Sequence, residues 1–219
     1  MFLGHYGLAF AAKRATPETS LGTLTLAGNL ADTVWPLLLL LGVEQVRVVP
    51  GWMTTSPLEF VAYPWSHSLL TQALAGLVFG AVVWVIRRDT RAAVVTGLLV
   101  VSHWFLDVPF HRPDLPVWPG GPKVGFSLWD SAAITYGSEA LLFGAGVWLY
   151  ATQTKAKDAK GSLALWALVV FLALVYAAAA FGPPPPTANA VAWTTLSLWL
   201  LVPWTYFIDS HRNLRPLPG

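Results

Sequence analysis

Apolar segments of about 20 residues, the length of helix that crosses a bilayer, constrain the fold of this chain more than any other feature. Their runs are continuous and lack the period-two alternation of a membrane β-barrel. The sequence therefore predicts an all-α membrane bundle of about six transmembrane helices. The predicted spans are residues 22–43, 66–86, 92–110, 128–151, 162–181 and 190–208.

Composition agrees with a membrane protein and excludes some kinds of site. Hydrophobic residues make up 55% of the 219 residues and charged residues 11%, whereas soluble domains have about 25% charged residues. The chain contains no cysteine, so it has neither disulfides nor thiolate ligands. We expect residues 1–219 to form a single integral membrane domain in which His, Asp and Glu would bind any transition metal.

Basic residues are distributed unevenly between the two predicted ends of the bundle. Of the 13 Lys and Arg residues, only Arg47, Arg112 and Lys123 fall on the less basic side. The positive-inside rule makes the more basic side cytoplasmic, which predicts an inner (plasma) membrane protein with a cytoplasmic C-terminus. The net charge of +2 is therefore a sign of topology, and no nucleic acid partner is expected.

Residues 1–12 form a further apolar segment that is too short to span. The basic pair Lys13 and Arg14 follows this segment, the reverse of the order in a signal peptide. A short N-terminal helix could dip partway into the membrane from the far side or lie along the cytoplasmic interface. Only the first arrangement brings His5 to the depth of the polar residues in the spans.

Ionisable residues within the apolar segments are the main indication of function, because they are costly in a bilayer. A helical rise of about 1.5 Å per residue places Asp32, His103, Asp107 and Glu139 in the middle or outer half of the membrane. His67 lies near the outer end of its predicted helix. These residues share one layer, beneath two Pro-, Gly- and Trp-rich outer connections that could cover it. The sequence therefore predicts a membrane-embedded site.

His103 and Asp107 form the most specific motif of the chain. Their i, i+4 spacing puts both side chains on one helix face, where they can share a metal or the carboxylate can orient the imidazole. The alternative is that His103 and Asp107 are buried and form hydrogen bonds only with each other. His67 follows Ser66, a residue type that caps helices, so His67 is either a ligand or a histidine at a helix end.

Other polar residues keep several roles open. Glu139 is a candidate ligand, general base or hydrogen-bonding link between helices, and His111 a candidate ligand, proton carrier or loop residue. A nitrogen and oxygen ligand set suits Zn²⁺, with Mn²⁺ or Fe²⁺ as alternatives. The candidate metal ligands are His5, Asp32, His67, His103 and Asp107, and the candidate catalytic residues are Asp32, Glu139 and His111.

Four segments of the first half resemble a known family in their order and approximate spacing. They are His5 with Gly7, residues 28–32, residues 66–70 and residues 103–107. They are similar to the YdjM-like family of LexA-binding inner-membrane proteins, which are described as membrane-bound metal-dependent hydrolases. In this chain Ala31 and Val34 stand where that family has proline and often a second acid.

A more distant similarity is to zinc-dependent phospholipase C and its related nucleases, which are helical. Their ligand order of His, Asp, His and then His-x-x-x-Asp is matched from His5 to Asp107. Their later His-x-x-x-Glu pair is matched only at Glu139, because Thr135 stands in place of the histidine. The resemblance implies one or two metal ions that activate water.

We therefore expect a metal-dependent hydrolase that cleaves a phosphoester or ester bond in a lipid or lipid-linked substrate, with membrane lipids as its partners. Two other classes stay open. One is a proton-coupled transporter or permease that uses the His, Asp and Glu residues as a relay. The other is a structural membrane protein in which polar residues only hold helices together.

Overall fold

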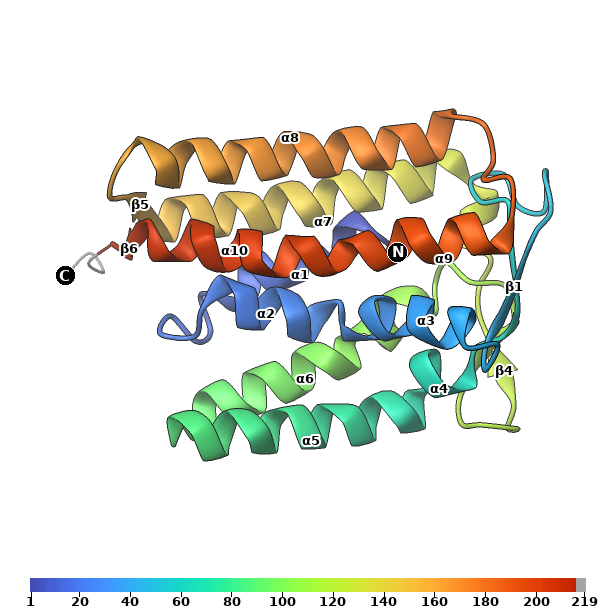
Figure 1. Ribbon diagram of the computed structural model, residues 1–219, viewed down its shortest axis with the longest axis horizontal. Helices are drawn as coiled ribbons and strands as arrows, with labels where there is room; N and C mark the ends of the chain where they lie inside the picture. The colour runs from blue at the N-terminus through green and yellow to red at the C-terminus, as the bar shows by residue number, and fades with distance from the viewer. Residues whose placement is uncertain (216–219) are drawn as a thin grey trace.

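A computed structural model describes residues 1–215. The protein is an elongated bundle of helices that run along a common direction, with short paired strands at both ends (Figure 1). The predicted all-α class is confirmed. The strands form three two-stranded antiparallel sheets: β1 (Gln45–Val48) with β2 (Leu58–Ala62), β3 (Leu115–Pro116) with β4 (Lys123–Val124), and β5 (Thr154–Ala156) with β6 (Arg212–Leu214).

Within residues 1–215, four helical segments are long and apolar enough to cross a membrane. Only 17–33% of the residues in their apolar stretches are buried, so most of these side chains face outward, as in a protein surrounded by lipid. These four apolar segments indicate a membrane protein. The segments are α5 (Leu69–Arg87), α7 (Ala132–Gln153), α8 (Ala159–Phe181) and a continuous run made of α9 (Ala188–Leu196), the 3-10 helix η2 (Ser197–Leu200) and α10 (Leu201–Ser210).

The predicted count of six spans is not confirmed. The first predicted span is broken at Asn29 into two helices that meet at an angle of 55°, and counting this pair as one span gives five. Asn29 ends the first helix by donating from its side chain to the Thr25 carbonyl. The third predicted span is one helix, but its polar residues lower its hydropathy. These helices are α2 (Leu21–Gly28), α3 (Leu30–Leu40) and α6 (Thr90–Asp107).

Long helices begin at short polar residues. Each of these side chains accepts a hydrogen bond from a backbone N–H in the first turn, which has no partner within its own helix. Because an unpaired backbone group is especially costly in lipid, the caps help to define where each apolar helix starts. The capping residues are Ser68 for α5, Asp89 for α6, Ser131 for α7, Asp158 for α8 and Thr187 for α9.

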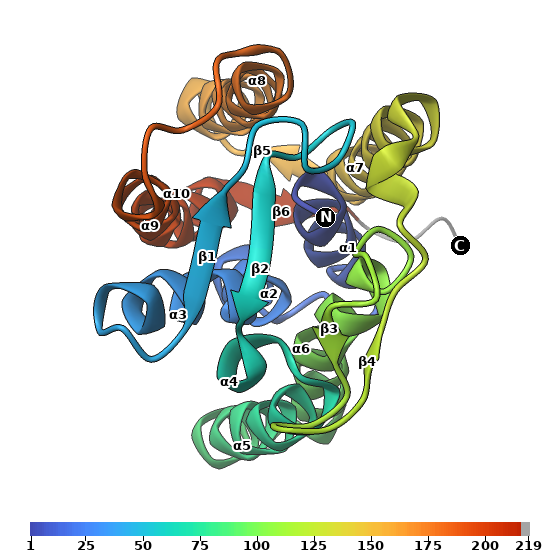
Figure 2. The same ribbon diagram turned by 90° about the vertical axis from the view of Figure 1, so that its right-hand side faces the viewer.

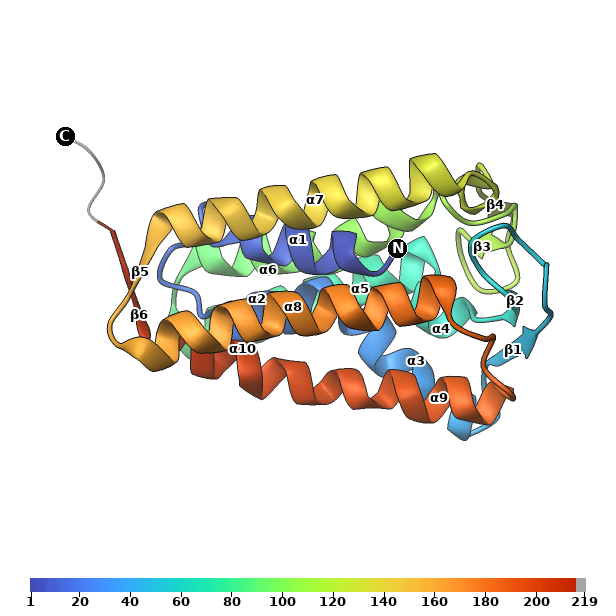
Figure 3. The same cartoon turned by 90° about the horizontal axis from the view of Figure 1, so that it is seen from above.

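The N-terminal helix α1 (Leu3–Ala12) lies inside the bundle, against α7, α2 and α6 (Figure 2). Its C-terminal end is held at the basic end of the protein, where Lys13 bonds to Asp209 and to the Thr19 carbonyl. Its N-terminus lies partway along the bundle (Figure 3). Neither predicted arrangement of residues 1–12 is therefore right, because this helix enters from the basic end and is surrounded by protein.

Glycines allow two helix pairs to approach closely. In the pair formed by α1 and α7, a Cβ on Gly7 or Gly146 would overlap the backbone of the opposite helix. Between α5 and α6, a Cβ on Gly76 would lie 2.6 Å from the Gly97 carbonyl oxygen. Such contacts between small residues are typical of membrane helices, which gain little from burying apolar surface against each other.

We expect Gly146→Ala to destabilise the protein, because the added methyl group overlaps the Gly7 backbone and forces α1 away from α7. Overpacking of this kind costs about 1–3 kcal/mol. Gly144→Ala, on the same helix, is the matched control, since nothing lies within 4 Å of its Cβ position. Thermal unfolding in detergent should separate the two variants, and equal unfolding temperatures would contradict the close packing.

Candidate metal centre

The structure brings together all five residues predicted as metal ligands. His5 comes from α1, Asp32 from α3, His67 from the short helix α4 (Pro64–His67), and His103 and Asp107 from α6. Their side chains form two groups that share His103, and within each group the potential ligand atoms lie within 4.8 Å of one another. The groups are His5, His103 and Asp107, and Asp32, His67 and His103.

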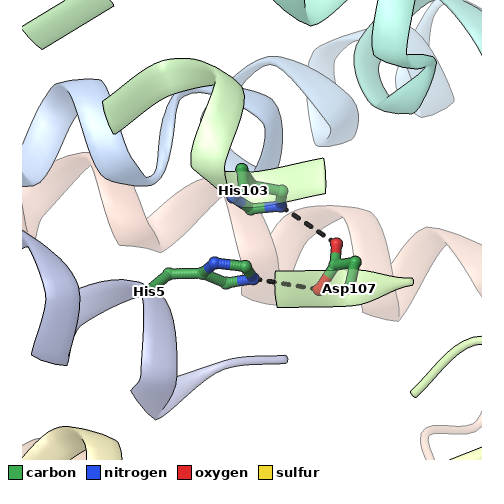
Figure 4. A group of neighbouring side chains, drawn as sticks. All are labelled: His5, His103 and Asp107. Carbon is green, nitrogen blue, oxygen red and sulfur yellow. Dashed lines mark hydrogen bonds and ion pairs between the residues drawn. The ribbon is translucent and has the colours of Figure 1, made fainter. Parts of the chain in front are cut away.

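Asp107 contacts both histidines of the first group (Figure 4). Its Oδ1 lies 3.1 Å from Nε2 of His5, and its Oδ2 lies 3.3 Å from Nε2 of His103. The two imidazole rings stack in parallel with their centroids 3.6 Å apart. The amino group of Met1 also contacts Asp107. All of these groups are buried, so the Met1 amino group and His5 compensate the carboxylate in place of water.

Asp32 joins the second group and is its most accessible member. Its Oδ1 lies 3.5 Å from Nε2 of His67 and 3.7 Å from Nε2 of His103. The Asp32 side chain is 18% exposed, whereas those of both histidines are at most 4% exposed. The bend between α2 and α3 places Asp32 in the first turn of α3, so this side of the centre is the one that solvent or a substrate can reach most directly.

The predicted role of Ser66 as a helix N-cap is wrong. Ser68 caps α5 by accepting a hydrogen bond from the Thr71 N–H, and its extended backbone separates α5 from α4. Ser66 lies within α4 and bonds instead to the Glu44 carboxylate and to Nδ1 of His67. His67 is therefore the last residue of a separate one-turn helix, because the chain breaks at Ser68 before the long helix begins.

The second ring nitrogen of two candidate ligands has a fixed partner. Nδ1 of His103 lies 3.0 Å from the carbonyl oxygen of Gly28, which can only accept, so this nitrogen donates. Nδ1 of His67 lies 2.7 Å from Oγ of Ser66. Histidines that bind metals commonly donate their other N–H to such a partner, which fixes the tautomer and the ring orientation. In contrast, Nδ1 of His5 has no partner among the described residues.

These contacts leave electron pairs of several atoms facing one small space. A histidine that donates from Nδ1 has a bare Nε2, and an ionised carboxylate has no proton to offer. Such atoms repel one another at 3.3–3.7 Å unless a proton or a metal ion lies between them. Ligands of a tetrahedral zinc ion with bonds of about 2.1 Å are about 3.4 Å apart. Nε2 of His103 has no hydrogen-bond partner in the described part of the chain. The site therefore fits a divalent transition metal.

His111 lies next to the centre but outside both groups. It is buried, with its Nε2 3.9 Å from Asp107 Oδ2 and its Nδ1 3.0 Å from Asp114 Oδ1. Tyr63 donates to the same Asp114 oxygen, and burial, reinforced by that carboxylate, raises the pKa of Tyr63 well above its usual range. Burial lowers the pKa of His111. His111 lies in the loop after α6, as the loop interpretation predicts, and its contacts extend from Asp107 to the partly exposed Asp114.

Glu139 acts as a link between helices. Its two carboxylate oxygens accept hydrogen bonds from the backbone N–H groups of Phe2 and Gly4, both at 2.7 Å. It therefore satisfies N–H groups at the start of α1 that have no partner within that helix. Glu139 belongs to neither group of candidate ligands. Of the three roles open for this residue, the contacts match the hydrogen-bonding one.

Sequence reasoning missed several residues that support the site. Tyr63 and Asp114 contact Nδ1 of His111. Glu44 bonds to Ser66, which in turn bonds to His67. Tyr63, Asp114 and Glu44 belong to no motif. Glu44 and Ser66 are 22 positions apart, a separation at which no sequence pattern predicts contact. The one available signal for Glu44 is that it is an acid directly after an apolar segment.

Comparisons with protein-family models, curated proteins and solved structures found no match to this chain. Its function is therefore inferred from the geometry and chemistry of the site, since a helical membrane fold alone does not define an activity.

We expect Glu139→Ala to lower the free energy of unfolding, because it leaves the buried N–H groups of Phe2 and Gly4 without acceptors. Each such group costs about 1–3 kcal/mol. Denaturant or thermal unfolding in detergent measures the change. Ser138→Ala is the neighbouring control, since that hydroxyl bonds only to carbonyl groups of its own helix. A Glu139→Ala protein as stable as wild type would exclude the linking role.

Proposed function

We propose that this protein is a membrane-embedded, metal-dependent hydrolase. One observation carries the proposal: buried Nε2 atoms of histidines whose Nδ1 atoms are already bonded face the carboxylates of Asp32 and Asp107. A site assembled from four separate helices in this way suits a bound cation. A group that only joins helices would instead have each donor paired with an acceptor.

Five residues would hold the metal, which we propose to be zinc, with manganese or iron as alternatives. Bound zinc would supply a water molecule of lowered pKa and would stabilise negative charge as the substrate reacts. Its ligands would be His5, Asp32, His67, His103 and Asp107.

The residues of the chain supply proton transfer and access. Asp32 is the most exposed of the five, and only its Oδ1 faces the histidines, so its other oxygen is available to accept a proton from water. Because the Asp32 side chain is 18% exposed, it would pass that proton directly to solvent. His111 would provide a second path, from the buried Asp107 to the more exposed carboxylate of Asp114. Glu139 has no part in this scheme, because both of its oxygens bind the backbone of α1.

The surroundings of the site favour a lipid or lipid-linked substrate that carries a phosphoester or ester bond. The outer helices expose apolar side chains along most of their length, so the substrate would approach from the bilayer. The ion pair of Lys13 and the bond of Lys157 to Ser210 lie at the β5–β6 end. Most basic residues gather there, and we place this end and the C-terminus in the cytoplasm of an inner-membrane protein. The proposal agrees with the resemblance to YdjM-like hydrolases.

We expect detergent-purified wild-type protein to contain about one or two zinc or manganese ions per chain by elemental analysis. His103→Ala should lose both the metal and the hydrolysis of phospholipids or lipid phosphates, because His103 belongs to both ligand groups. Asp32→Ala should also lose metal binding and hydrolysis, or retain each only weakly. His211→Ala is a control histidine variant outside the site, since its ring contacts Ser210 and Phe207.

A protein that binds no metal, even when metal is added back, would contradict the hydrolase. The second candidate is then a proton relay in a transporter, because contacts of 3.1–3.7 Å run without a gap from His5 through Asp107, His103 and Asp32 to His67. Proton-driven transport by proteoliposomes, abolished in His103→Ala, would support that alternative. Lipid hydrolysis that survives in His103→Ala would also end the assignment of this residue as a ligand.

A further inference from the structure

Glu44 is a buried acid that the chemistry described so far does not use. It lies between α3 and β1 and is 2% exposed. Its Oε1 accepts hydrogen bonds from the N–H groups of Trp65 and Ser66, at 2.8 and 2.9 Å. Its Oε2 accepts a bond of 2.6 Å from the Ser66 hydroxyl. Each of its partners is a donor, so Glu44 acts as an ionised carboxylate.

The directions of these bonds determine the tautomer of His67. A serine hydroxyl has one proton, and Ser66 gives it to Glu44, because a carboxylate cannot donate in return. Oγ of Ser66 therefore meets Nδ1 of His67, 2.7 Å away, as an acceptor, and Nδ1 must carry the imidazole proton. Nε2 is then left with its lone pair toward Asp32.

We infer that Glu44 is a positioning residue of the proposed metal centre, holding His67 through Ser66 in the tautomer that can bind a metal through Nε2. The inference rests on the proposed function, because Glu44 can position a ligand only if His67 binds a metal. It adds an acid, Glu44, that no motif of the chain includes. Carboxylates that act on a ligand through a hydrogen bond are typical of metal centres, and losing one weakens metal binding by about 10–100-fold.

The two oxygens of Glu44 have separate roles, which allows a specific test. Oε1 satisfies two N–H groups at the start of α4, as a capping residue does. Oε2 has one partner, the Ser66 hydroxyl. In Glu44→Gln, the amide oxygen can keep the capping bonds while the amide N–H₂ replaces Oε2. The amide then donates to Ser66, Ser66 donates to Nδ1 of His67, and the proton of His67 moves to Nε2.

The first measurement is the tautomer of His67, by NMR of metal-free protein labelled with ¹⁵N-histidine in detergent, at a pH of about 8. The signals of His67 are identified by their absence in His67→Gln. We expect wild-type His67 to be protonated at Nδ1 and His67 in Glu44→Gln to be protonated at Nε2. A wild-type His67 protonated at Nε2 would overturn the inference, as would an unchanged tautomer in Glu44→Gln.

The second measurement is the affinity of each variant for Zn²⁺ by competition with a chelator. We expect Glu44→Gln and Ser66→Ala each to weaken binding by about 10–100-fold. The double variant should be no weaker than the weaker single one, because both act through the same bond to His67. Ser68→Ala is the matched control: it removes the cap of α5 and should lower the unfolding temperature while leaving Zn²⁺ affinity unchanged.

The two measurements distinguish failure of this inference from failure of the proposed function. If wild type binds no Zn²⁺ but His67 changes tautomer in Glu44→Gln, the hydrogen bonds from Glu44 through Ser66 to His67 are correct and the hydrolase proposal is wrong. If wild type binds Zn²⁺ and Glu44→Gln binds it equally well, the metal centre stands and the positioning role of Glu44 is excluded. Equal losses in Ser68→Ala and Ser66→Ala would show a general effect of altered folding and would also overturn the inference.

Discussion

Burial of Asp107 is the constraint on which the rest of the structure depends. An ionised carboxylate inside an apolar bundle costs several kcal/mol unless charged or hydrogen-bonding groups surround it. Here the imidazole that donates a hydrogen bond to Asp107 is that of His5, which lies on α1. The N-terminal helix therefore lies in the interior, where Gly7 and Gly146 permit the necessary approach to α7 and Glu139 satisfies its first N–H groups.

A second layer of polar groups lies around the first. Gly28 binds Nδ1 of His103 through its carbonyl, and Ser66 binds Nδ1 of His67. Each contact reduces the freedom of an imidazole ring and selects which nitrogen carries the proton. These outer groups are thus connected to the inner ones, and in the proposed metal centre the loss of an outer group would change the chemistry of a ligand that it contacts.

Local patterns in the sequence are sufficient for part of this structure. Continuous apolar runs predict the helical class, and the i, i+4 spacing of His103 and Asp107 predicts that they share a helix face. Contacts that join distant segments have no such signal. The placement of α1 depends on close packing against a helix more than 130 positions later, and Glu44 reaches Ser66 only because the β1–β2 pairing folds the chain back. Hydropathy alone also hides the break at Asn29, because it occurs between two apolar helices.

The interior position of α1 has a consequence for how the protein is made. This segment has 10 residues and is too short to remain across a bilayer by itself. Its resting place is formed partly by α7, which is synthesised long afterwards. The segment is therefore synthesised well before part of its resting place exists, and the centre that contains His5 can be completed only after α7 has been made.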